Sequence, residues 1–116
     1  MSVLYVVVTV VTIVVTGGIA IADFARAKFV LANSAEVGVP QSMLPLLGGL
    51  KAAGAVGLLL GLLGMDILGI AAAGGLVLFF IGAVAVHVRA RVFYNMAFPG
   101  TYLALAVASF ALAISQ

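Results

Sequence analysis

Long uncharged runs of apolar residues fill most of this chain. Three runs carry no charged residue, at positions 3–22, 67–86 and 92–116, and a fourth at 43–65 is interrupted only by Lys51. A helix needs about 20 predominantly apolar residues to cross a bilayer. The pattern therefore predicts an all-α fold, an integral membrane four-helix bundle that forms a single membrane domain over residues 1–116. The predicted spans are approximately residues 3–23, 43–64, 67–88 and 97–114.

The composition favours membrane insertion and argues against several other classes. Apolar residues make up 66% of the chain and charged residues 7%, whereas a soluble domain carries about 25% charged residues. The net charge of +2 arises from five basic residues in an almost uncharged chain, so it does not indicate a nucleic-acid partner. There is no cysteine, and one histidine with three carboxylates predicts no metal site. No nucleophile–base pair is visible, so we predict no catalytic residue and no catalytic activity of the chain on its own.

The basic residues predict the orientation in the membrane. Arg26 and Lys28 lie between the first two spans, and Arg89 and Arg91 lie between the last two. The remaining loop and both tails carry no basic side chain. Because basic residues near span ends favour the cytoplasmic side, we expect both termini outside the cytoplasm, in the plasma (bacterial cytoplasmic) membrane.

The loop after the first span is the longest of the three. Residues 24–29 continue the helical pattern past Asp23, so the first helix is expected to extend to about residue 32. The following residues 34–40 predict one helical turn, with Ser34 as its N-cap and Gly38 as its terminator.

Small residues recur every four positions along the second span. They are Gly49, Ala53, Gly57 and Gly61. Such a ridge lets another helix approach closely. We interpret it as a helix-packing surface inside the bundle, with the interface of a homo-oligomer as the alternative.

Polar side chains form a stripe along the first span. At about 100° per residue, Tyr5, Thr9, Thr12, Thr16 and Asp23 fall on one face of the helix. Polar groups in a span usually face the bundle interior, because lipid offers them no partner. The alternative is that each threonine hydrogen-bonds to its own helix and can then face any direction.

Ionisable side chains predict a polar cluster near the cytoplasmic side. Lys51 lies about 12 Å into its span, at about 1.5 Å per residue, where an ammonium needs a partner or must extend to the interface. Asp23 and His87 are expected at a similar depth, and Arg91 and Tyr94 join the His87 face if that helix continues. One acid among several bases suits an anionic or carbonyl-bearing ligand. A purely structural role for these residues is the alternative.

Four short segments carry a resemblance to a known family. They are residues 23–29 (DFARAKF), Gly38-Val39-Pro40 with Ser42, residues 48–54 (GGLKAAG) and residues 87–91 (HVRAR). In these segments the chain resembles the DoxX-like family of small four-span bacterial membrane proteins. The resemblance implies a four-helix membrane bundle and an association with redox systems, since the family name is linked to a membrane subunit of thiosulfate:quinone oxidoreductase.

Three functions are compatible with these features. The first is a non-catalytic subunit or accessory protein of a quinone-linked redox system, with a quinone or lipid head group in the polar pocket and Lys51 and His87 donating to its carbonyl. Because the chain has no cysteine, electron chemistry would need that quinone or a redox protein partner. The second is a membrane assembly factor or scaffold. The third, a small four-span transporter, is disfavoured because Asp23 lies at the end of its span rather than well inside it.

Overall fold

The computed structural model describes residues 1–116 and consists of helices joined by short turns. Four of the helices are long and apolar enough to cross a membrane, which confirms the predicted all-α membrane bundle. In chain order the elements are α1 (Val3–Phe24), α2 (Lys28–Glu36), the short 3₁₀ helix η1 (Gln41–Met43), α3 (Leu44–Leu62), α4 (Asp66–Arg89) and α5 (Ala97–Ile114).

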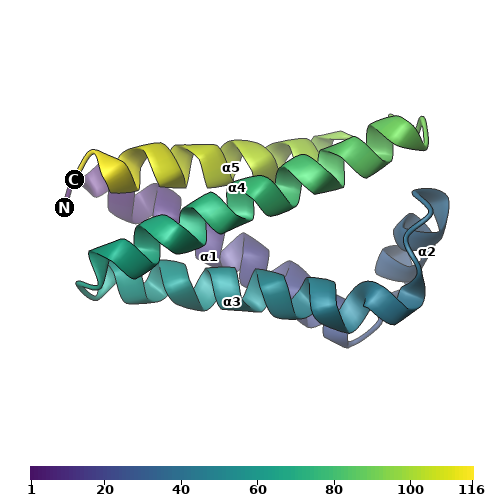
Figure 1. The fold of residues 1–116 in the computed structure, drawn as a ribbon, viewed down its shortest axis with the longest axis horizontal. Helices are drawn as coiled ribbons and strands as arrows, with labels where there is room; N and C mark the ends of the chain where they lie inside the picture. The colour runs from purple at the N-terminus through teal and green to yellow at the C-terminus, as the bar shows by residue number, and fades with distance from the viewer.

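The four long helices lie alongside one another in a ring (Figure 1). α1 packs against α3 and α5, and α4 packs against the same two helices. Both chain termini and the α3–α4 turn lie at one end, here called the termini end, while α2 and the α4–α5 loop lie at the other, the α2 end. The bundle is 40 Å long, close to the roughly 40–45 Å thickness of a bilayer with its head groups.

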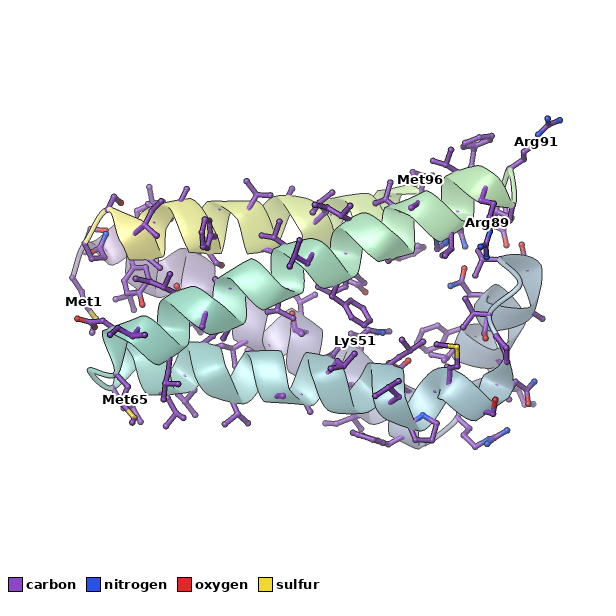
Figure 2. The ribbon with its side chains drawn as sticks, in the orientation of Figure 1. Met1, Lys51, Met65, Arg89, Arg91 and Met96 are labelled. Atoms are coloured by element: carbon purple, nitrogen blue, oxygen red, sulfur yellow. The ribbon has the colours of Figure 1, made fainter.

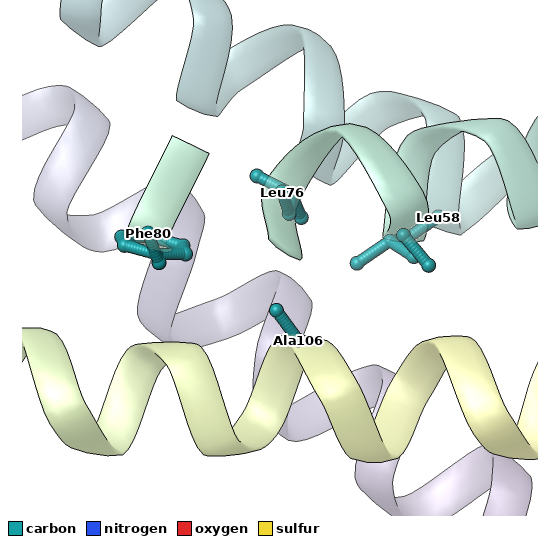
Figure 3. Packing of buried hydrophobic residues seen from close by; sticks show 5 residues of the cluster. Leu58, Leu76, Phe80 and Ala106 are labelled. Atoms are coloured by element: carbon teal, nitrogen blue, oxygen red, sulfur yellow. The ribbon is translucent and has the colours of Figure 1, made fainter. Parts of the chain in front are cut away.

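The apolar core forms where three helices meet. Leu58 of α3, Leu76 and Phe80 of α4, and Ala106 of α5 are buried there together with Ala73 (Figure 3). Large apolar side chains also cover the outside of the bundle. That outer surface is suited to contact with the lipid bilayer, because lipid tails are as apolar as these side chains.

α3 and α4 approach each other closely at two glycines of α3. A Cβ added to Gly61 would lie 2.6 Å from the Cα of Gly69, and one added to Gly57 would lie 2.5 Å from the Cβ of Ala72. These two members of the predicted small-residue ridge therefore face α4, and the absence of their side chains lets the helices touch. Close approach of this kind is typical of small residues in membrane helices.

The other half of the ridge does not take part in this contact. Gly49 faces open space, with nothing within 4 Å of an added Cβ, and Ala53 is exposed. The reason is geometric, because α3 and α4 diverge toward the α2 end (Figure 1).

The first loop differs from its sequence-based description. The first helix does not extend to residue 32, because Arg26 takes a left-handed conformation (φ 53°) that ends α1 at Phe24. Ser34 lies within α2 and is not an N-cap; its hydroxyl donates to the carbonyl of Val39. Gly38, at φ 76°, does end this helix, with the Val39 N–H donating to the Ser34 carbonyl in a Schellman arrangement.

A single methyl group at the α3–α4 contact is expected to destabilise the bundle. Gly61→Ala places a carbon against the Gly69 backbone, which cannot rotate away, and overpacking of this kind costs about 1–3 kcal/mol. Gly49→Ala is the matched control, because the same change there meets nothing within 4 Å. Thermal unfolding in detergent should show a lower Tm for Gly61→Ala only. Equal Tm values for the two variants would contradict the close contact.

Candidate functional site

The centre of the site is an ion pair between α1 and α3. The Lys51 ammonium donates to Oδ2 of Asp23 at 2.8 Å, and the two side chains are 12% and 3% exposed. Asp23 comes from the last turn of α1. It can approach α3 because Gly48 has no side chain, and a Cβ built there would lie 3.1 Å from the Cβ of Asp23.

An aromatic ring on α4 completes the surroundings of Lys51. The Nζ atom lies 5.3 Å from the centroid of the Phe79 ring, within the range of a cation–π interaction. Phe79 packs edge-on against Phe80, whose ring lies 5.4 Å from that of Tyr102 on α5. Figure 2 shows the Lys51 side chain between α3 and α4, in the region where these helices diverge.

The pair leaves hydrogen-bonding capacity for a ligand. An ammonium carries three N–H donors, and Asp23 takes one of them. Because the Asp23 carboxylate already balances the positive charge, a second anion would meet a carboxylate as well as an ammonium. The arrangement is therefore chemically suited to a neutral acceptor, such as a carbonyl oxygen on a flat ring that can lie against Phe79.

His87 belongs to a separate polar network at the α2 end. Its Nδ1 lies 2.8 Å from the Ala83 carbonyl, and its Nε2 lies 3.1 Å from Oδ1 of Asn33 on α2. The amide of Asn95 donates to the same oxygen at 3.0 Å. Because a carbonyl only accepts, Nδ1 carries a proton. The Asn33 side-chain oxygen therefore lies between the His87 ring and the Asn95 amide.

The structure therefore separates His87 from Asp23 and Lys51, with which it was expected to form one cluster. No hydrogen bond or ion pair joins His87 to Lys51 or Asp23. His87 lies eight residues beyond Phe79 on α4, which is about 12 Å along the axis at about 1.5 Å per residue. Asp23 and Lys51 are brought together, whereas His87 lies nearer the end of the bundle.

Arg91 and Tyr94 do not continue the face of α4 that carries His87. The helix ends at Arg89, and Arg91 takes a left-handed conformation at φ 57° that turns the chain. Both residues are exposed, and the Tyr94 hydroxyl donates to the Glu36 carboxylate of α2 at 2.6 Å. That hydrogen bond raises the pKa of Tyr94 above its ordinary value. This contact ties α2 to the α4–α5 loop at the surface.

The polar stripe of α1 lies inside the bundle. Its members Tyr5, Thr9, Thr12 and Thr16 are buried. The Thr12 hydroxyl lies 2.8 Å from both the Val8 carbonyl and the Ser109 hydroxyl, so it bonds its own helix and also α5. The Thr9 hydroxyl has no hydrogen-bond partner.

Four contributing residues were absent from the sequence-based set of site residues. Phe79 and Ser109 lie within uncharged apolar runs, where no periodic pattern singles them out. Asn33 and Glu36 lie in the first loop, whose path across the bundle decides their contacts. A weak signal existed for the two α2 residues, which lie three apart and therefore on one face of a helix.

Four apolar helices around a buried lysine–aspartate pair define a small multi-pass membrane protein. The chain belongs to the DoxX-like family, whose family model matches residues 7–109. This match confirms the resemblance seen in the sequence and covers both members of the ion pair. No match was found among curated proteins or among solved structures.

The ion pair predicts strong coupling between its two members. Lys51→Met or Asp23→Asn alone leaves one buried group without its partner, which can cost about 3–5 kcal/mol, whereas removing both costs much less. The double variant should therefore recover much of the lost stability. Unfolding free energies of the four proteins in one detergent measure the coupling, and additive single effects would contradict it.

Proposed function

We propose that this DoxX-like protein is a non-catalytic subunit or accessory protein of a quinone-linked redox system. In this proposal Lys51 donates to a carbonyl of the quinone head group, and Phe79 contacts its ring. The observation that carries the proposal is the Lys51 side chain, which is 12% exposed and whose ammonium is charge-balanced by Asp23 and lies 5.3 Å from an aromatic centroid. A bound quinone would supply reversible two-electron chemistry that the chain's own side chains do not offer.

The donor set agrees with a quinone better than with an anionic head group. A quinone is neutral, and its oxygens accept hydrogen bonds without meeting the Asp23 carboxylate as a like charge. Lys51 can give such an oxygen a charge-assisted hydrogen bond, and bonds to charged groups are worth about 1.5–3 kcal/mol. His87 lies too far along α4 to share the same carbonyl, so we assign the head group to Lys51 alone.

A scaffold or assembly factor is the second candidate. It is favoured by the ion pair itself, because Asp23 and Lys51 satisfy each other without any ligand. In that case the pair holds α1 against α3, and the exposed apolar surface carries the interaction with a partner membrane protein.

Removing the ammonium should remove quinone binding. Because Lys51→Met alone leaves Asp23 unpaired, the informative variant is the double change Asp23→Asn/Lys51→Met. Lys28→Met, at the exposed first residue of α2, is the control. Equilibrium binding of a short-chain quinone to protein in lipid nanodiscs should weaken by about tenfold or more in the double variant, which corresponds to a loss of about 1.4 kcal/mol. The Lys28→Met protein should bind as the wild type does.

Two results would contradict this assignment. Undiminished binding by the double variant would place the head group elsewhere. Absence of binding by the wild type, together with a membrane protein that co-purifies with it, would favour the scaffold.

We further propose a bacterial plasma-membrane location with both termini outside the cytoplasm. The proposal rests on the four basic residues Arg26, Lys28, Arg89 and Arg91, which gather at the α2 end. Ser2, Ser42 and Ser115 are all exposed, and the chain has no cysteine of its own. Single cysteines at Ser2 and Ser115 should react with an impermeant thiol reagent added to intact cells, and one at Ser42 should react only after lysis. The reverse pattern would invert the orientation.

A further inference from the structure

An apolar groove runs along the outer face of α3 and α4. Its volume is about 910 Å³, near the upper end of the roughly 300–1,000 Å³ found for small-molecule sites. Most of the residues that line it are apolar, and the lining includes Gly54, Gly57, Gly75, Leu50, Leu68 and Phe79. The groove therefore has the apolar lining that a hydrocarbon chain requires.

The groove ends next to the candidate site. Phe79 lines the groove at that end, and the centroid of its ring lies 5.3 Å from the ammonium of Lys51, which does not itself line the groove. From Phe79 the groove follows α4 back to Leu68, a distance of about 16 Å at about 1.5 Å per residue. A molecule with its polar head at Lys51 would thus find the groove leading away from the head, toward the termini end.

We infer that this groove holds the isoprenoid tail of the quinone whose head group lies at Lys51. The inference rests on the proposed function and extends it from a head-group contact to a site for the whole amphiphile. It assigns the specificity for a tail to the α3–α4 groove, and in particular to the part of it that Gly75 lines.

Depth and charge favour this occupant over a phospholipid. The Phe79 end of the groove lies near Lys51, about 12 Å inside the span at about 1.5 Å per residue. A phosphate head group would have to leave water to reach it. At the other end of the groove, Leu68 also borders a smaller surface hollow that is lined by Asp66. That carboxylate would repel an anionic head group. A neutral head group at the Phe79 end, with its tail toward Leu68, avoids both the desolvation of a phosphate and the repulsion by Asp66.

The contribution of the tail should be moderate. Inside a bilayer the tail leaves one apolar environment for another, so only closer packing favours the groove. We therefore expect the tail to change the affinity about three- to tenfold, which corresponds to at most about 1.4 kcal/mol.

Two glycines of α4 provide a matched test. An added Cβ meets nothing within 4 Å at either Gly75 or Gly82, so a side chain can begin at both positions without a backbone clash, but only Gly75 lines the groove. The probes are two quinones with the same ring, one with four isoprene units and one with a methyl group in their place. In nanodiscs, Gly75→Leu should raise the Kd of the long-tailed quinone about three- to tenfold and leave that of the methyl quinone unchanged. Gly82→Leu should change neither, and partitioning into the bilayer cancels in each ratio of variant to wild type.

The outcomes separate the tail site from the proposed function. If both quinones bind the wild type and Gly75→Leu behaves like Gly82→Leu, the tail site is wrong while the head-group site stands. If neither quinone binds the wild type, the proposed function fails and the tail site fails with it. Gly75→Leu could also weaken the binding of both quinones equally. Alternatively, it could reduce the amount of bound phospholipid, or the fraction of the chain that is dimeric, while the affinity for the long-tailed quinone is unchanged. Each of these results would overturn the tail site, the last two by giving the groove a different occupant.

Discussion

A lysine inside an apolar span needs a partner for its charge, and the positions of three helices depend on how Lys51 obtains one. An unpaired lysine near the centre of a span costs about 2.5–3.5 kcal/mol on insertion scales. Here Asp23 supplies the counter-charge from the end of α1, at 2.8 Å, and Phe79 supplies its ring from α4. Gly48 makes the contact possible because any side chain there would press on Asp23. The pair therefore holds α1 against α3 at the α2 end, and the Gly61–Gly69 contact holds α3 against α4 at the other.

The path of the chain changes directly after Asp23. α1 ends at Phe24, one residue after Asp23, and the chain does not continue as a straight helix. Instead the left-handed turn at Arg26 directs it into α2, whose Asn33 and Glu36 then reach the far side of the bundle end. There Asn33 meets His87 and Asn95, and Glu36 meets Tyr94. These side-chain bonds link α2 to α4 and to the α4–α5 loop, so α2 extends from the α3 side of the bundle to the α4 side.

The sequence could predict what depends on periodicity and charge, but not what depends on how a turn is made. Three uncharged runs and a fourth interrupted only by Lys51 were enough to identify the four spanning helices, and the depth of Lys51 pointed to Asp23 and His87 as its neighbours. Arg26 and Arg91 take left-handed conformations, which are uncommon for residues other than glycine, and no local pattern marks them. The continuation of α1 was therefore wrong, and the condition under which Arg91 and Tyr94 would join the His87 face is not met, because α4 ends at Arg89. The partner of His87 could not be predicted either, because Asn33 reaches it only through the turn at Arg26.

The opening at Lys51 can itself be explained by the order of residues along α3 and α4. The opposed residues grow in size from the termini end toward the α2 end: Gly61 faces Gly69, Gly57 faces Ala72, Gly54 faces Leu76, and Lys51 faces Phe79. Each step places more side-chain volume between the helix axes, so the helices are in contact at one end and separated at the other (Figure 1). Gly57 and Gly61 thus lie where α3 and α4 are in contact, and the ammonium with its aromatic neighbour lies where the two helices are separated. Because close packing at Gly61 and separation at Lys51 belong to one graded interface, the interface that holds the bundle together also leaves the Lys51 side chain 12% exposed.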